Sequence, residues 1–338
     1  WGEGPEMIGV LVHLDVVPEG SGWTYPPYGG EIHDEKIYGR GTCDDKGPAM
    51  AALVALKAIK DADIKFQRRV RVIFGTDEES GSECIEYYKK HYESPTMGFS
   101  PDADFPIING EKGILTFEFN AEFCAPQNQK GIKILSLKGG HRHNMVPDYA
   151  KADLKGDGAA IQRAVEDYVK ITGADLRFEI DDGIVVSSHG VSAHGSTPEK
   201  GKNAVMQLIC MLATLEIAPS QREYIDFLNS TIGDDTTGKH LGIDFSDEIS
   251  GALSFNVGIA KIDNEKASVV VNITYPIDST SEEVLANIRE NTPKSIAINV
   301  VSDDKPHYVP EDNPMIQKLK AAYEKVTGEK AYCFSIGG

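Results

Sequence analysis

The short segment GTDEESG, residues 75–81, brings Asp77, Glu78 and Glu79 together in one turn. It overlaps the end of VRVIFG, an apolar run that predicts a buried strand. A solvent-exposed turn would account for these charges. So would a metal site, because carboxylate oxygens bind divalent cations. The segment by itself leaves both interpretations open.

A second candidate is HLDVVP, in which His13 and Asp15 follow another apolar run. Residues two apart in a strand point to the same face, so these two side chains emerge together. A metal-bound imidazole needs its other ring nitrogen held, and the Asp15 carboxylate is a plausible group for that purpose. The alternative is a pair of polar side chains that face solvent at the end of a strand.

Two further acidic segments are GRGTCDDKGP, with Asp44 and Asp45, and SPDADFP, with Asp102 and Asp104. Pro48 suits the first position of a helix after the first segment, and one carboxylate before it can cap that helix. All four segments follow or lie between elements of one predicted parallel sheet, and ligands bind outside the carboxyl ends of such strands. Oxygen-rich ligation with one or two histidines suits Zn²⁺, Mn²⁺ or Co²⁺.

The elements that would position these groups alternate between strand and helix. Apolar runs predict strands at 8–13 and 70–75 and a more exposed strand at 32–39. Helical spacing predicts one helix from Pro48 and another near 82–91. This alternation predicts an α/β architecture with a largely parallel sheet.

Beyond about residue 113 the pattern predicts a second α/β domain of more antiparallel character. Near the end, Asn313 and Pro314 predict the N-cap and first residue of a helix. The other expected strands are 114–120, 132–137, 184–189, 252–258 and 267–275, and the other expected helices are 159–171, 202–216 and 281–291.

Length and composition narrow the classes of protein. A chain of 338 residues favours two domains. The net charge of −18 argues against a nucleic-acid or anionic-membrane partner, which would need clustered basic side chains. We find no signal peptide and no apolar run of membrane-spanning length. The five cysteines form no CxxC pair, which favours free thiols and a cytoplasmic protein.

The segments HLDVVPEGSGW, GRGTCDDKGP, GTDEESG and FSPDADFPIINGEKG resemble the motif series of the zinc aminopeptidase, carboxypeptidase and aminoacylase family. HYVP at 307–310 resembles its peptidase V type of dipeptidase, which includes Xaa-His dipeptidases and carnosinase-like enzymes. The resemblance implies a three-layer α/β/α catalytic domain formed by 1–112 and 307–338, truncated at both ends. It also implies an inserted α+β lid, residues 113–306, that binds substrate.

The resemblance also implies roles for the acidic segments. His13 and Asp102 would bind one of two divalent metal ions, most naturally Zn²⁺, with Mn²⁺ or Co²⁺ as alternatives. Asp44 would bridge both ions, and Glu79 would bind the second. Glu78 would be the general base.

Further roles follow from the same resemblance. Asp15 would orient His13, and the Asp44–Asp45 peptide bond would be cis. His194 in GVSAHGSTPEKGKNA would stabilise the oxyanion of the reaction. Asn144 in HNMVPD, with Gly337 and Gly338, would contact the substrate.

The chain departs from the family pattern in two places. Thr274 in NITYP stands where an arginine usually grips the substrate carboxylate, so that clamp is absent. His141, Arg142 and His143 are candidates to replace it. The last metal ligand of the family is a histidine beyond the motif that Gly337 and Gly338 begin, so we expect weak binding of the second metal and little activity in this form.

We therefore expect a metallopeptidase that hydrolyses dipeptides, either of broad specificity or of the Xaa-His type. Its partner would be a short peptide, and it would be a monomer or a homodimer. One alternative is an N-acyl amino acid amidohydrolase, which Thr274 keeps open. Another is a catalytically silent homologue that binds peptide or metal, against which Glu78 argues.

Overall fold

The computed structural model describes residues 1–20, 22–124, 129–180 and 182–337. The chain divides into two compact units, Trp1–Pro106 and Ile107–Gly338. Gly338, one of the predicted substrate-binding residues, lies outside the described residues. Each unit has its own sheet and its own buried apolar cluster.

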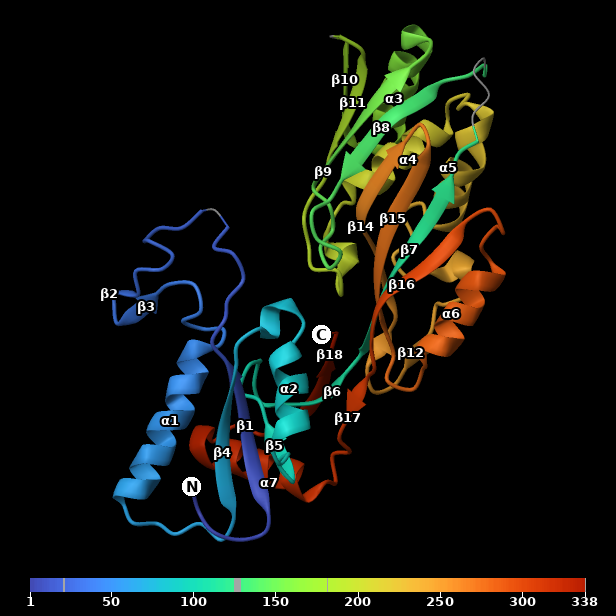
Figure 1. The fold of residues 1–338 in the computed structure, drawn as a ribbon. Helices are drawn as coiled ribbons and strands as arrows, with labels where there is room; N and C mark the ends of the chain where they lie inside the picture. The colour runs from blue at the N-terminus through green and yellow to red at the C-terminus, as the bar shows by residue number, and fades with distance from the viewer. Residues whose placement is uncertain (21, 125–128, 181, 338) are drawn as a thin grey trace. The chain divides into compact units, whose positions relative to one another are not determined.

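The first unit is built on a parallel sheet with the strand order β4-β1-β5 (Figure 1). Val10 and Val12 point from β1 into a small core that Ala49 of α1 completes. The carboxyl ends of β1 and β4 coincide, because His13 pairs with Gly75. The elements are β1 (Met7–His13), α1 (Lys46–Asp61), β4 (Arg69–Gly75), the 3₁₀ turn η1 (Glu78–Ser80), α2 (Glu83–His91) and β5 (Met97–Phe99).

The exposed strand predicted at 32–39 is wrong, because the structure has a hairpin of two short strands there. β2 (Glu31–His33) pairs antiparallel with β3 (Lys36–Tyr38). Asp34 and Glu35 form the turn with φ angles of 48° and 61°. A two-residue hairpin turn with positive φ at both positions matches the right-handed twist of the strands.

The helix expected from Pro48 begins earlier than predicted. α1 begins at Lys46, so Pro48 is its third residue rather than its first. Proline is tolerated there because the first N–H groups of a helix have no partner within the helix. The expectation for α7 (Pro314–Thr327) is confirmed, since the Asn313 side chain accepts a hydrogen bond from the Met315 N–H.

The second unit is built on an eight-stranded sheet with the order β10-β11-β9-β8-β14-β15-β7-β16 (Figure 1). All of its pairings are antiparallel, as the sequence pattern predicts. The strands are β7 (Gly113–Glu122), β8 (Lys133–Gly139), β9 (Tyr149–Lys155), β10 (Asp175–Ile180), β11 (Ile184–His189), β14 (Ser254–Asp263), β15 (Lys266–Tyr275) and β16 (Ala297–Asp304).

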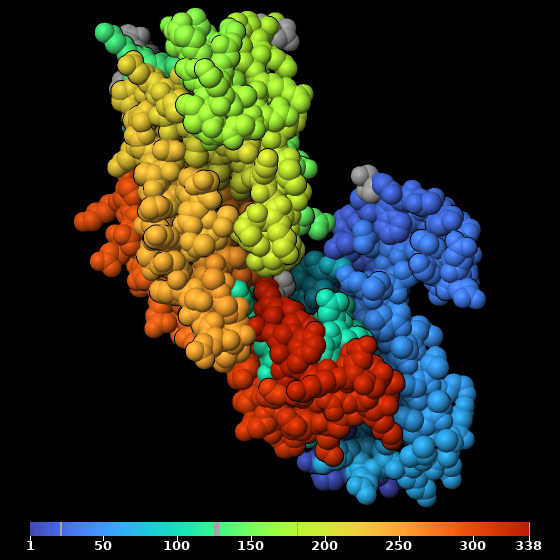
Figure 2. All heavy atoms as spheres, turned by 180° about the vertical axis from the view of Figure 1, so that it is seen from behind, coloured from blue at the N-terminus to red at the C-terminus, as the bar shows by residue number. Residues whose placement is uncertain are grey.

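One face of this sheet carries the main core. Leu115, Phe117 and Phe119 alternate along β7 and are fully buried in it. The helices that pack with the sheet form the surface seen from behind in the green, yellow and orange part of Figure 2. They are α3 (Gly158–Thr172), α4 (Ala204–Ala213), α5 (Pro219–Thr231) and α6 (Ser281–Glu290). The 3₁₀ turns η2 (Pro198–Lys200) and η3 (Lys239–Leu241) lie between them along the chain.

Two small sheets complete the second unit. β6 (Ile107–Glu111) lies between β17 (His307–Tyr308) and β18 (Cys333–Ile336). A segment that precedes the large sheet in the sequence therefore pairs with two segments that follow it. β12 (Ser246–Asp247) and β13 (Gly251–Ala252) form a hairpin. The prediction of an α/β protein with an antiparallel second domain is confirmed, and the proposed domain boundaries at 112 and 307 stay predictions.

Candidate metal centre and active site

His13 is the residue around which the acidic segments gather. It ends β1 and is 2% exposed. Its Nε2 lies 2.8 Å from Asp44 Oδ1 and 3.2 Å from Asp102 Oδ2. Three segments far apart in the sequence therefore meet at one imidazole.

Asp15 connects this imidazole to the acidic turn. His13 Nδ1 lies 3.0 Å from the Asp15 carbonyl oxygen and 3.4 Å from its Oδ1. The Asp15 carboxylate also accepts hydrogen bonds from the N–H groups of Glu78 and Glu79, each at 3.1 Å. One carboxylate thus holds both the ring and the turn, which are the contacts that an orienting role for Asp15 requires.

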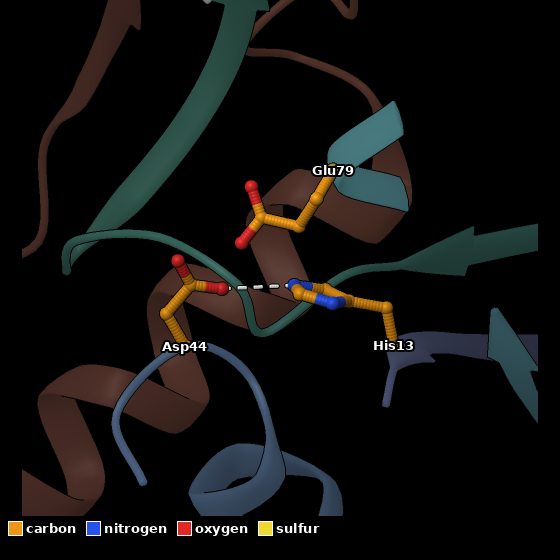
Figure 3. Close-up of side chains that lie close together, drawn as sticks. All are labelled: His13, Asp44 and Glu79. Atoms are coloured by element: carbon orange, nitrogen blue, oxygen red, sulfur yellow. Dashed lines mark hydrogen bonds and ion pairs between the residues drawn. The ribbon is translucent and has the colours of Figure 1, made fainter. Parts of the chain in front are cut away.

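Two acids of the turn, Asp77 and Glu79, have different hydrogen-bond partners. Asp77 accepts a hydrogen bond from the Cys84 N–H at 3.1 Å and thereby joins the turn to α2. Glu79 Oε1 accepts one from the Val17 N–H at 3.1 Å. In Figure 3 the Glu79 carboxylate points toward Asp44 and His13, and ligand atoms of these three residues lie within 4.8 Å of one another.

Asp45 was not assigned a role from the sequence, yet it is the most buried acid of the site. It is 0% exposed, and its Oδ2 accepts a hydrogen bond from the His13 N–H at 3.0 Å. The expected cis peptide bond between Asp44 and Asp45 is present. Asp45 occupies the N-cap position of α1 but makes no side-chain capping bond, so the interpretation of these acids as a helix cap is wrong.

The pKa shifts in this cluster reflect its burial and its concentration of carboxylates. Burial is the largest influence on the pKa of His13 and lowers it, but Asp102, Asp44 and Glu78 raise it more, so the net direction is upward. Burial is the largest influence on the pKa of Glu78 and raises it; His13 lowers it, but neighbouring carboxylates raise it further, so the net direction is upward. Burial and neighbouring carboxylates also raise the pKa of Asp102 to about 6. Burial also raises the pKa of Asp45.

These observations fit a divalent cation. Asp45 Oδ1 is buried without a hydrogen-bond partner among the residues that the structure describes. A second group formed by His13, Asp45 and Asp102 also has its ligand atoms within 4.8 Å of one another. Acids this close repel one another unless a cation neutralises them. The two groups share His13, and together they supply the histidine and carboxylate donors that Zn²⁺ and Mn²⁺ accept.

The other predicted site residues belong to the second unit. Met145 and His194 form an isolated antiparallel bridge, and the Gly195 N–H donates to the Asn144 carbonyl oxygen at 2.7 Å. The exposed His194 ring lies with its Nδ1 2.7 Å from Ser196 Oγ. The structure therefore brings Asn144 and His194 together on neighbouring segments.

Gly337 lies beside the turn that carries His194 and Ser196. A Cβ atom on Gly337 would lie 2.8 Å from Ser196 Cβ and 3.8 Å from Thr274 Oγ1, so this backbone packs directly against the His194 turn. Thr274 itself is 2% exposed, and its hydroxyl lies 2.7 Å from Ser254 Oγ. The hydroxyl at this position is thus already paired inside the unit.

The sequence matches known proteins over its whole length. The model of the family described as peptidase family M20/M25/M40 matches residues 9–338. A putative dipeptidase, YtjP, of Bacillus subtilis is 40% identical over 341 residues, which cover 100% of this chain and 73% of that protein. A putative dipeptidase of Staphylococcus haemolyticus is 35% identical over 346 residues, with the same coverage of 100% and 73%.

Solved structures share the fold at low sequence identity. The aminoacylhistidine dipeptidase of Vibrio alginolyticus has a TM-score of 0.56 at 16% identity, and the match covers 100% of this chain and 75% of that one. The dipeptidase Dug1p of Saccharomyces cerevisiae has a TM-score of 0.52 at 15% identity, covering 100% and 70% of the two chains.

Proposed function

Because this chain belongs to peptidase family M20/M25/M40, we propose that it hydrolyses dipeptides with the help of two divalent metal ions. The observation that carries the proposal is the buried His13, whose Nε2 lies between the carboxylates of Asp44 and Asp102. The names of the curated relatives, putative dipeptidases at 40% and 35% identity, support a dipeptide substrate.

The described side chains suggest how the ions would be held. His13 and Asp102 would bind one ion and Glu79 would bind the other. Asp44, whose ligand atom lies near those of His13 and Glu79, would be shared. Zn²⁺ is our first choice, with Mn²⁺ or Co²⁺ as alternatives. When bound, such a metal pair lowers the pKa of water and polarises the substrate carbonyl.

Glu78 would carry the proton. Burial and the neighbouring carboxylates raise the pKa of Glu78, which moves a carboxylate toward the range that suits a general base near neutral pH. Its carboxylate would accept a proton from the attacking water and then donate it to the leaving amine. The Asp15 carboxylate, which accepts the Glu78 N–H, would keep the base in position.

The second unit would supply the substrate contacts. His194 would donate to the oxyanion that forms on the substrate, and Asn144 would bind the substrate backbone. Ser196 Oγ is paired with His194 Nδ1, which leaves the Nε2 side of the ring for a ligand. Gly337 has no side chain that could obstruct this place.

Hydrolysis assays on the full-length protein test this proposal. We expect cleavage of dipeptides, including Xaa-His dipeptides, in the presence of Zn²⁺ or Mn²⁺. Glu78→Gln should lower kcat by at least about 100-fold, which is the low end of what a general base contributes. Glu83→Gln, in α2 just after the turn, is the matched control and should leave kcat unchanged. Activity that survives Glu78→Gln would contradict the mechanism.

N-acyl amino acids form the second arm of the same assay. Thr274 is buried and paired with Ser254, so no charged clamp for a substrate carboxylate comes from this position. The N-acyl amino acid amidohydrolase stays the second candidate because position 274 departs from the dipeptidase pattern, while both substrate classes carry a terminal carboxylate. Faster hydrolysis of N-acyl amino acids than of any dipeptide would favour it.

We further propose that the protein acts in the cytoplasm, as a monomer or homodimer. All five cysteines are free, which suits a reducing compartment. None of the helices in the described part of the chain is both long and apolar enough to span a bilayer.

A further inference from the structure

A row of buried polar side chains lies on the face of the large sheet opposite its apolar core. Ser254 and Asn256 of β14 pair with Thr274 and Asn272 of β15, and all four are less than 9% exposed. Buried polar groups lower stability unless they make hydrogen bonds. The partners of this row therefore indicate what it supports.

Asn256 has its partners in the segment that carries Asn144. Its Nδ2 donates to the carbonyl oxygens of His143 and Met145, each at 3.0 Å. These two carbonyl groups flank Asn144 on either side. Asn256 is 1% exposed, and in the described part of the chain its Oδ1 has no hydrogen-bond partner. Both N–H groups of the Asn256 amide therefore bond to one short segment of backbone.

Close backbone contacts hold the same segment against the sheet. A Cβ atom on Gly258 would lie 2.2 Å from the His143 carbonyl oxygen. A Cβ atom on Gly140, whose φ is +77°, would lie 1.9 Å from the Gly258 carbonyl oxygen. No other residue type fits at either position without displacing backbone.

The hydrogen bonds continue from Asn144 to His194. The Gly195 N–H donates to the Asn144 carbonyl oxygen at 2.7 Å. The Ser254 hydroxyl, which is paired with Thr274, donates to the Gly195 carbonyl oxygen at 3.3 Å. The polar row therefore contacts both the Asn144 segment and the His194 turn.

We propose that Asn256 is a positioning residue, which fixes the backbone on both sides of Asn144 and so sets the placement of Asn144 and His194 relative to each other. This inference rests on the proposed function, in which these two residues contact the substrate. An apolar side chain at position 256 would avoid burying an unpaired oxygen. The amide has a use here because its two donors hold the substrate-binding segment.

A double-mutant cycle tests the proposal in the full-length protein. Asn256→Ala, and the similar-sized Asn256→Leu, should lower kcat/KM by on the order of 100-fold, because small displacements of binding groups have large effects on rate. In an Asn144→Ala background the same substitutions should lower kcat/KM by less than about threefold. A purely structural role would instead give the same fold-change in both backgrounds and would overturn the proposal.

Gln221 provides a matched control. It is 2% exposed, and its Nε2 also donates to two carbonyl oxygens, those of Ile134 at 2.9 Å and Asp263 at 3.0 Å. It lies on α5, and neither partner belongs to the Asn144 segment. Its Oε1 also accepts a hydrogen bond from the Ile134 N–H at 3.0 Å, so Gln221→Ala should lower the melting temperature at least as much as Asn256→Ala does. Its effect on kcat/KM should be the same with or without Asn144.

Amide hydrogen exchange separates this inference from the proposed function. The Gly195 N–H, bonded to Asn144, should lose protection in Asn256→Ala and keep it in Gln221→Ala. If the wild-type protein hydrolysed no dipeptide, the proposed function would fail while this measurement still decided the role of Asn256. Unchanged protection of Gly195 in Asn256→Ala would refute the positioning role.

Discussion

At the scale of single residues, the candidate centre depends on side chains that each serve two neighbours. His13 uses its backbone N–H for Asp45 and its ring for Asp44 and Asp15. Asp15 holds the ring and also the N–H groups of Glu78 and Glu79. A change at one such residue therefore affects several others, which makes the effect of a substitution larger than one lost contact.

Asp15→Asn tests this dual role. An asparagine offers one acceptor oxygen in place of two, so it cannot hold both N–H groups of the turn and also face the His13 ring. We expect the affinity for Zn²⁺ to fall by about 10- to 100-fold, as is typical when a group behind a metal ligand is lost. Isothermal titration of the metal-free protein with Zn²⁺ measures the change.

Asp77→Asn is the control from the same turn. Asp77 bonds to the Cys84 N–H at the start of α2 and belongs to neither group of candidate metal-binding residues found in the described part of the chain. This variant should lose some stability and keep its metal affinity. Equal losses of affinity in the two variants would mean that Asp15 has no special position.

The sequence predicted some of these residues and missed others for a physical reason. Asp15 was predictable as a carboxylate two residues after a candidate ligand, although β1 ends at His13 and Asp15 lies beyond the strand. Asp45 was not, because its burial and its bond to the His13 N–H depend on a tertiary contact between segments 32 residues apart. Asn256 was missed because nothing in a strand sequence shows which loop will cover it.

At the scale of elements, long periodic segments were predicted well and tight turns were not. The helix predicted near 82–91 is present as α2, and the strand predicted at 184–189 is present as β11. The segment 32–39 was predicted as one strand, but Asp34 and Glu35, with positive φ angles, divide it into two. Turn geometry of this kind has no apolar period to reveal it.

The hydrogen bonds that Asp247 accepts predict that the stability of the fold depends on pH. Asp247 of β12 accepts hydrogen bonds from the N–H of Ser250 and from that of Asp278, the latter at 3.0 Å. Burial is the largest influence on its pKa and raises it, but these bonds and the Ser250 hydroxyl together lower it further, so the net direction is downward. The stabilisation is complete above the ordinary pKa of about 4 and is lost as the pH falls through the lower, folded value.

Urea denaturation between pH 7 and pH 3 checks this expectation. Wild-type protein should be more stable than Asp247→Asn at pH 7, and the difference should shrink as the pH falls below about 4. The control is Asp244→Asn, a change at an exposed aspartate nearby, which should change the stability at pH 7 less than Asp247→Asn does. A difference for Asp247→Asn that grows toward acid pH would contradict the sign argued here.

At the scale of the whole molecule, the functions proposed for the two units are distinct. Every residue proposed to hold metal lies within Trp1–Pro106, and Asn144, His194 and Gly337 lie within Ile107–Gly338. The apolar core is unevenly divided as well, because the large buried cluster belongs to the second unit. We therefore expect bound ions to contribute more to the stability of the first unit than to that of the second.

Removal of metal should accordingly affect one unit selectively. A ligand at a concentration 100 times its Kd stabilises a protein by about 2.7 kcal/mol. We expect chelation to lower amide protection across residues 1–106 and to leave 107–338 unchanged, as measured by hydrogen exchange with mass spectrometry. In the His13→Ala variant, chelation should have no further effect. Loss of protection spread evenly over both units would place the ions elsewhere.

The backbone contact between Gly140, Gly258 and His143 has a consequence for protein engineering. Since neither glycine accepts a side chain, a library designed to alter substrate preference should leave positions 140 and 258 invariant. The side chains of His141 and Arg142 are exposed, so these two positions can be randomised with little risk to folding. New specificities should therefore be sought in the side chains of this loop, with its length and path kept as they are.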